Sequence, residues 1–173
     1  MRRSRTRDID FVVERSIERE VLVRILALDP GVTTGWALFS QSHPTFGEVY
    51  TLQYGQMGPE PHHQKLFDML HTTSCLKQDV VVVESYQRQP TAHGLLTPVE
   101  YIGVVKLHQQ VYGCILIEQS RSCKAFWTNE KLRILEHLRV GQPHAMDALR
   151  HLLYYITKSG DDQFVQQLKA LTS

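Results

Sequence analysis

Two segments of almost unbroken apolar residues constrain the fold more than any other feature of this sequence. The first spans residues 21–28 and is interrupted only by Arg24, and the second is the run of four valines at 80–83. Short apolar runs rich in β-branched residues are typical of strands that are buried on both faces of a sheet. The first run ends at Asp29, before Pro and Gly, and the second ends at Glu84. The sequence therefore predicts an α/β layer fold in which two buried strands deliver acidic residues to their ends.

The other elements follow from periodicity and turn residues. Short aromatic and β-branched stretches at 35–39 and 47–54 predict an antiparallel meander after the first strand. A fifth strand is expected at 114–117. Apolar residues at helical spacing predict helices over 62–76, over 98–111 with Thr97 as N-cap, over 129–138 and from Pro143. This order predicts a mixed five-stranded sheet flanked by helices.

The length of 173 residues fits one domain with short appendages. We expect a basic N-terminal arm at 1–20, a main domain at 21–160, and a helix or tail at 161–173. Four arginines among the first seven residues suit either a solvated arm or an arm that lies along phosphates. The net charge of +1 neither indicates nor excludes a polyanionic partner.

Membrane and secreted classes are not favoured by the sequence. No apolar run approaches the roughly 20 residues that span a bilayer, and no apolar signal-peptide core follows the arginines. The three cysteines show no metal or redox spacing, which predicts reduced thiols. We expect a cytoplasmic protein, neither secreted nor membrane-bound.

A third acidic residue joins Asp29 and Glu84 as a candidate for chemistry. Asp147 falls in the first turn of the last long helix, off the apolar stripe that would pack on the sheet. Carboxylates at the ends of buried strands are costly unless they are solvated, paired or bound to metal. Without cysteines they form a hard ligand set for Mg²⁺ or Mn²⁺, and two such ions can stabilise both oxygens in phosphodiester cleavage. The sequence therefore predicts a metal site that hydrolyses phosphodiester bonds.

Two histidines lie on the same helix as Asp147. His144 is three residues before Asp147 and could bind metal, exchange a proton with the attacking water, or make surface hydrogen bonds. His151, seven residues after His144, shares that face and could support the site, face DNA or lie at the surface. We include His144 in the predicted site and leave His151 out.

Three segments together resemble the active-site segments of RuvC-like Holliday junction resolvases of the RNase H-like superfamily. They are ILALDPGVTTGWA at 25–37, VVVVE at 80–84 and HAMDALR at 144–150, and the similarity in order and spacing runs from about residue 24 to 157. The resemblance implies an RNase H-like fold, a homodimer, Mg²⁺ or Mn²⁺ as cofactor, and paired nicks in the four-way junctions of DNA recombination and repair. It also implies that Asp29, Glu84 and Asp147 bind metal, and it places His144 where other members carry an acidic residue or a histidine.

The sequence departs from the family pattern in two places. Well-studied members carry an aromatic wedge three residues after the second acid, whereas Tyr86 comes two residues after Glu84. Tyr86 is therefore a candidate wedge or a residue buried near the strand end. The N-terminal extension of about two dozen residues is also unusual, and small phage-encoded members, which cut other branched DNA, are similar to this chain as well.

Contacts with DNA are predicted at cations close to aromatic residues, on a surface of the kind that follows a phosphate backbone. Phe126 and Trp127 belong either to this surface or to the core. The candidate DNA-binding residues are Tyr86, Arg88, Lys106, Arg121, Lys124 and Lys131.

Other functions remain open at the level of sequence. The chain could be a non-catalytic module that binds branched DNA, although three retained acids argue against this. It could be a flap or RNase H-type nuclease of the same fold. A fragment of a sugar-kinase-like ATPase also begins with Asp-x-Gly, but such proteins need two domains of this size. For a dimer, we expect the contact on the helix at 98–111.

Overall fold

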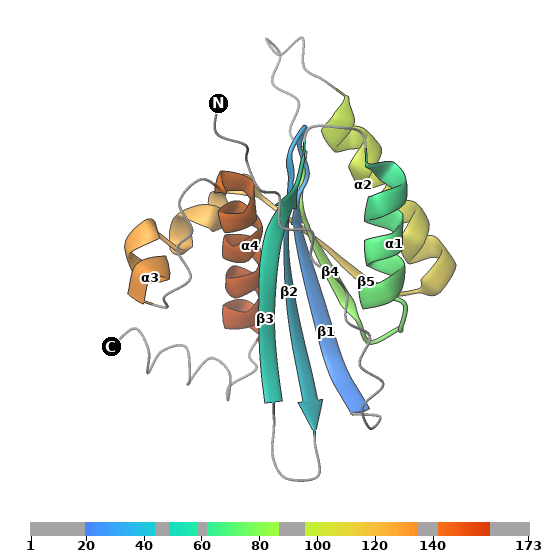
Figure 1. Ribbon diagram of the computed structural model, residues 1–173, viewed down its shortest axis with the longest axis horizontal. Helices are drawn as coiled ribbons and strands as arrows, with labels where there is room; N and C mark the ends of the chain where they lie inside the picture. The colour runs from blue at the N-terminus through green and yellow to red at the C-terminus, as the bar shows by residue number, and fades with distance from the viewer. Residues whose placement is uncertain (1–19, 44–48, 59–61, 87–95, 135–141, 160–173) are drawn as a thin grey trace, which may run out of the picture.

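A computed structural model describes residues 20–43, 49–58, 62–86, 96–134 and 142–159 (Figure 1). Residues 161–173 and all but the last residue of the arm at 1–20 lie outside the described residues, as does Arg88. The strands are β1 (Glu20–Asp29), β2 (Thr34–His43), β3 (Val49–Met57), β4 (Val80–Glu84) and β5 (Ile115–Gln119). The helices are α1 (His63–Thr73), α2 (Thr97–Tyr112), α3 (Asn129–Ile134), α4 (Pro143–Ser159) and the 3₁₀ helix η1 (Arg121–Phe126).

The five strands form one mixed sheet in the order β3-β2-β1-β4-β5. β1 pairs antiparallel with β2, which pairs antiparallel with β3, as the predicted meander requires. β1 pairs in parallel with β4, and β4 pairs in parallel with β5. The carboxyl ends of the three parallel strands therefore meet at one edge of the sheet, and this edge positions the site.

Helices cover both faces of the sheet (Figure 1). Alternate residues of β1 and β4, such as Ala27 and Val82, face α4, where Leu149, Leu152 and Leu153 are fully buried. The intervening residues pack against α1 and α2, including Leu66, Leu70, Tyr101 and Val105. Burial on two faces explains why these strands have no polar alternation. It confirms the layered α/β arrangement expected from the two apolar runs.

The structure corrects several details of the sequence prediction. Leu96, and not Thr97, occupies the N-cap position of α2, with no side-chain capping bond. The meander strands are longer than predicted, and β5 is displaced toward Gln119. Periodicity locates the centre of such elements better than their ends, because end positions depend on tertiary contacts. The described part of α3 ends at Ile134, so the predicted end at 138 falls outside the described residues.

Helix α2 buries only part of its apolar sequence. Tyr101, Val105 and His108 face the core, whereas Leu107 and Val111 are 56% and 61% exposed. Leu96 and Val99 are also exposed at the start of the helix. Among the described helices, none is long and apolar enough to cross a membrane.

Candidate metal centre

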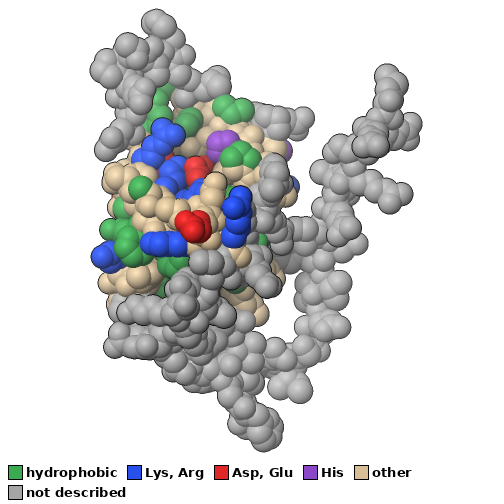
Figure 2. Space-filling model, turned by 90° about the vertical axis from the view of Figure 1, so that its left-hand side faces the viewer, with side chains coloured by type: hydrophobic (Ala, Val, Ile, Leu, Met, Phe, Trp, Pro, Cys, Tyr) green, Lys and Arg blue, Asp and Glu red, His purple; other side chains and the backbone are tan. Residues whose placement is uncertain are grey.

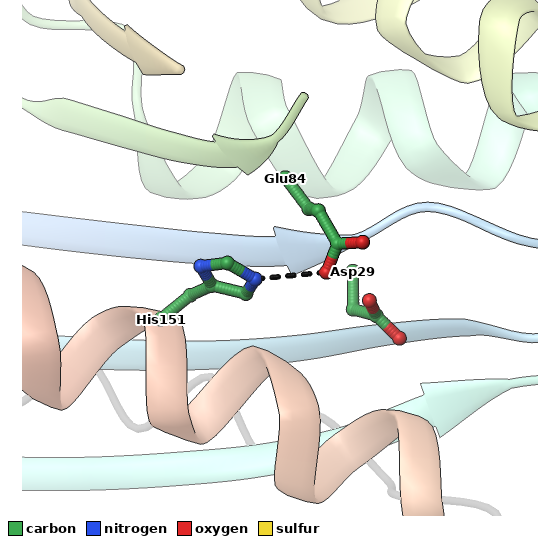
Figure 3. A group of neighbouring side chains, drawn as sticks. All are labelled: Asp29, Glu84 and His151. Carbon is green, nitrogen blue, oxygen red and sulfur yellow. Dashed lines mark hydrogen bonds and ion pairs between the residues drawn. The ribbon is translucent and has the colours of Figure 1, made fainter. Parts of the chain in front are cut away.

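Two carboxylates meet at the sheet edge because β1 and β4 are parallel neighbours in register. Leu28 pairs with Val83, so the next residues, Asp29 and Glu84, end adjacent strands side by side. The Asp29 side chain is 8% exposed and that of Glu84 is 17% exposed. Figure 3 shows the Asp29 and Glu84 side chains next to one another at this edge, with the Glu84 carboxylate also in contact with His151. Sequence reasoning predicted both residues, and the sheet brings them together.

The first turn of α4 adds His144 and Asp147 to this edge. Nδ1 of His144 lies 2.9 Å from Oδ2 of Asp29. Gly35 at the start of β2 makes this approach possible, because a Cβ atom there would lie 1.9 Å from the carbonyl oxygen of His144. The helix start therefore packs directly on the strand backbone, and all four predicted site residues are brought to one place.

Lys124 of η1 lies at the centre of the cluster. Its Nζ atom is 2.6 Å from Glu84 Oε2, 2.9 Å from Asp147 Oδ2 and 3.2 Å from Asp29 Oδ1. The side chain is only 13% exposed. Sequence analysis predicted Lys124 as a DNA contact, but in this structure its ammonium group is the cation shared by three carboxylates.

Arg150 holds the outer carboxylate in place. Its Nη1 donates to Asp147 Oδ1 at 2.5 Å, and its Nε donates to the carbonyl oxygen of Trp127 at 2.9 Å. A further hydrogen bond joins Arg150 to the side chain of Asn129. Arg150 thus ties α4 to the segment after η1, which keeps Asp147 turned toward the other two acids.

His151 is the site residue that sequence reasoning omitted. Its ring is fully buried, with Nε2 2.9 Å from Glu84 Oε2 and Nδ1 2.7 Å from Oε1 of Gln119 (Figure 3). The surface position considered for His151 is therefore wrong. The available signal was its place four residues after Asp147, which on a helix is the same face one turn later. Gln119 gave no such signal, because only the β4–β5 register places it beside Glu84.

The pKa values of Asp29 and Glu84, the two acids at the strand ends, are shifted in opposite directions by burial and hydrogen bonding. Burial raises the pKa of Asp29, and the charges and hydrogen bonds of Lys124 and His144 offset this only in part. Burial also acts to raise the pKa of Glu84, but hydrogen bonds from His151 and Lys124 outweigh it and bring that pKa to about 2. Burial likewise acts to lower the pKa of Lys124, yet its carboxylate partners raise it. Glu84 and Lys124 therefore form a stable ion pair, and Asp29 ionises at a higher pH than Glu84.

The donor set fits a divalent cation. Asp29, Glu84 and His151 each offer one ligand atom, and these atoms lie within 4.8 Å of one another. The ammonium group of Lys124 already satisfies three carboxylates that converge on a point, which is the arrangement a metal ion requires. Asp147 and His144 lie beside this group through Lys124 and Asp29. The cluster is a possible metal site.

The remaining predicted DNA contacts are spread over the surface. Tyr86 is 38% exposed two residues beyond Glu84, so it is not buried at the strand end. Arg121 is exposed at the start of η1, and Lys131 Nζ lies 4.6 Å from the centre of the Phe126 ring. Lys106 pairs with Glu118 on the side of the sheet that α2 covers. Of the two aromatics, Trp127 belongs to the core and Phe126 is 40% exposed.

Comparison with known proteins places the fold. No protein-family model and no curated protein matches this sequence. The chain is similar in structure to Thermus thermophilus RuvC, with 16% identity and a TM-score of 0.53 over 79% of this chain and 95% of that one. It is also similar to T. thermophilus RuvC in complex with Holliday junction substrate, with 18% identity and a TM-score of 0.54 over 79% and 94%. The predicted RNase H-like fold, with a mixed five-stranded sheet, is confirmed.

Proposed function

We propose that this chain is a metal-dependent endonuclease that hydrolyses phosphodiester bonds in branched DNA and resolves Holliday junctions by paired nicks. One observation carries the proposal: Asp29, Glu84 and Asp147 converge on a single cation at the edge of the sheet. Buried like charges are costly, so their retention favours a chemical role. The fold shared with a RuvC that was solved on a Holliday junction supports the choice of substrate.

Each residue has a defined part in this reaction. Asp29, Glu84 and Asp147 would hold Mg²⁺ or Mn²⁺, which when bound polarises the phosphate and activates water. His144 is 41% exposed on its side chain and contacts Asp29, so it can take a proton from the attacking water or complete the ligand set. Lys124 can neutralise charge on the scissile phosphate, and Arg150 keeps Asp147 oriented.

The proposed DNA path follows the face that carries α3 and α4. Figure 2 shows Lys and Arg side chains close to acidic and hydrophobic side chains on this face. Arg121 and Lys131 supply exposed cations there, and the ammonium groups of Lys131 and Lys158 lie near the exposed Phe126 ring. Tyr86, Arg88 and Lys106 are proposed as further contacts. Such cations contribute affinity through phosphates, which would make binding strongly dependent on salt.

We also propose a homodimer. Two opposed nicks in a two-fold symmetric junction require two sites related by the same symmetry. The exposed apolar side chains of α2 at Val99, Leu107 and Val111, with Leu96 at its N-cap, form a face that a second copy of the chain could cover.

A cleavage assay tests the proposal. Purified protein with Mg²⁺ or Mn²⁺ is expected to nick four-way DNA in preference to flap, linear duplex and RNA–DNA hybrid substrates. Asp29→Asn should lose cleavage at least 100-fold, on the order of a lost transition-state contact, while keeping its circular dichroism spectrum. The matched control Asp68→Asn alters an exposed acid on α1 and should cut as wild type does.

The substrate panel separates the alternatives. Preference for flaps or for RNA–DNA hybrid would replace junction resolution with another nuclease activity of the same fold. Tight binding to four-way DNA with no cleavage in either metal would overturn the nuclease and indicate a binding module. Equal cleavage by Asp29→Asn and wild type would remove the proposed site.

A further inference from the structure

The imidazole ring of His151 has polar partners on both sides. Nδ1 lies 2.7 Å from Oε1 of Gln119 and Nε2 lies 2.9 Å from Oε2 of Glu84. His151 is fully buried and Gln119 is 7% exposed, so water does not compete for either contact. The two partners end the paired strands β4 and β5, where Glu84 and Gln119 are opposite one another in register. The ring is therefore held at a fixed angle over the strand ends.

Both of these partners are hydrogen-bond acceptors as the side chains stand. Without metal, an N–H on Nε2 donates to Glu84 Oε2, which is the hydrogen bond that helps to lower the pKa of that acid. A neutral imidazole carries one N–H, so in the other tautomer Nδ1 donates to Gln119 Oε1 and the lone pair of Nε2 is left for an ion that also binds Glu84. A histidine whose other nitrogen donates to a fixed oxygen is the usual form of a metal-ligating histidine.

We infer that Nε2 of His151 is a ligand of the metal ion, together with Asp29 and Glu84, and that it makes this site select Mn²⁺ over Mg²⁺. The three donor atoms lie within 4.8 Å of one another, as ligands of one ion do. Mg²⁺ demands oxygen ligands, whereas Mn²⁺ accepts carboxylate oxygen and imidazole nitrogen in one shell. The inference rests on the proposed function, and it names the metal that function uses.

Gln119 is a positioning residue in this arrangement. It does not reach the reacting atoms, but its amide oxygen fixes the tautomer and the angle of the His151 ring. The alternative arrangement has the amide reversed, so that Gln119 donates to Nδ1 and His151 donates to Glu84. In that case His151 is only a hydrogen-bond donor, and it would take no part in metal binding.

Pulsed electron paramagnetic resonance of the Mn²⁺-loaded full chain separates these two arrangements. Imidazole bound to Mn²⁺ gives a ¹⁴N coupling that oxygen ligands do not give. We expect this coupling in the wild type and in His144→Gln, and we expect its loss when His151→Gln is combined with His144→Gln. Its absence from the wild type, its loss in His144→Gln, or its persistence in the double variant would overturn the inference. The first two results need no His151 variant, so they stand even where that variant fails to fold.

Metal titration tests the selectivity. In the wild type, Mn²⁺ should bind at least about tenfold more tightly than Mg²⁺, the size of effect expected from one well-placed ligand. His151→Gln supplies an oxygen in place of nitrogen, so it should weaken Mn²⁺ binding about tenfold and leave Mg²⁺ binding unchanged. Equal effects on both metals, or none on either, contradict the inference.

Two Gln119 variants report on the tautomer. Gln119→Glu keeps an acceptor for Nδ1 and should retain the ¹⁴N coupling. Gln119→Leu removes this acceptor and should weaken Mn²⁺ binding. Loss of the coupling in Gln119→Glu would favour the reversed amide. None of these measurements uses DNA, so a protein that binds Mn²⁺ through His151 but cuts no substrate would refute the nuclease alone.

Discussion

Lys124 supplies positive charge that the three carboxylates share. Its ammonium group contacts Asp29, Glu84 and Asp147, and its side chain is nearly buried. A buried charge cluster is strongly destabilised when one partner is removed, because the remaining charges lose their counter-ion. Without metal, Asp29 and Glu84 therefore depend on this lysine for charge compensation, whereas Asp147 also pairs with Arg150. A divalent ion at the proposed site would compete with Lys124 for the same oxygen atoms.

Replacement of Lys124 by Met should destabilise the metal-free protein by about 3 kcal/mol. Urea unfolding in EDTA measures this loss, and saturating Mn²⁺ should restore much of it by replacing the missing cation. Lys106→Met is the matched control, because Lys106 pairs with one carboxylate at a half-exposed position and should cost less than about 1 kcal/mol. An unchanged free energy of unfolding for Lys124→Met in EDTA would show that the ammonium is not needed.

The pKa of Glu84 predicts a specific loss of stability in acid. Its pKa is lowered from 4.5 to about 2, so the carboxylate stabilises the fold above pH 4.5 and loses that effect as the pH falls toward 2. The contribution is on the order of 3 kcal/mol. Asp29, whose pKa is raised, acts in the opposite sense, because its ionisation costs stability as the pH rises.

The test compares the free energy of unfolding between pH 4.5 and pH 2 in metal-free buffer. Glu84→Gln should flatten the acid decline, and Glu118→Gln, which alters an exposed carboxylate, should leave it as in the wild type. A Glu84→Gln profile as steep as that of the wild type would contradict the assignment of the low pKa to Glu84.

At the scale of elements, the site depends on how closely α4 approaches β2. The contact occurs at Gly35, where any side chain would collide with the carbonyl oxygen of His144. Farther along α4, Leu149 and Leu152 are fully buried against the sheet. The helix therefore cannot move away from the sheet without exposing core residues. The glycine thus sets the distance between the strand ends and the helix turn that carries Asp147.

Gly35→Ala should displace the start of α4 and weaken both stability and metal binding. The overlap cannot be relieved by a side-chain rotation, because the atom struck belongs to the backbone. We expect a loss of about 2 kcal/mol or more, in the range of overpacked cores, measured by thermal unfolding with and without Mn²⁺. Gly58→Ala is the control, since a Cβ there meets nothing within 4 Å. Similar melting temperatures for the two variants would count against the close approach.

At the scale of the whole molecule, the two faces of the sheet carry different kinds of surface. The α4 face continues into the carboxylate cluster and the cations of η1 and α3. The other face is covered by α1 and α2, and α2 presents large exposed apolar side chains to the outside. In the proposed function, catalysis and self-association would therefore fall on opposite layers, which would leave DNA access open in the proposed dimer.

Charged substitutions on α2 test the dimer. Val99→Asp and Leu107→Asp should give folded monomers in sedimentation velocity, because both side chains are exposed in the single chain. Ile102 is unsuitable for this purpose, since it packs against the core and a charge there would unfold the protein. Leu76→Asp, at an exposed apolar residue outside α2, should leave the dimer intact. A wild-type monomer, or dimers in both α2 variants, would refute the proposed contact.

Sequence patterns predicted the parts of this protein that are encoded locally. The apolar runs ending at Asp29 and Glu84 identified the central parallel strands, because burial on both faces leaves no polar alternation. The periodic stripe after Pro143 identified α4 and placed His144 and Asp147 off its buried face. The start of α2 and the end of β5 were less well predicted, since Leu96 makes no side-chain capping bond and no Gly or Pro directly follows Gln119.

The tertiary structure decided which side chains meet. Lys124, Gln119 and His151 come from three elements, and only the order of β1, β4 and β5 with α4 across them brings these residues to the carboxylates. Their sequence contexts are those of a surface lysine, a strand-end amide and a helix histidine. The sequence by itself determined the strands, the layers and the acidic residues, because burial and periodicity act along the chain. The partners of those acids depend on contacts between distant segments, which no local pattern records.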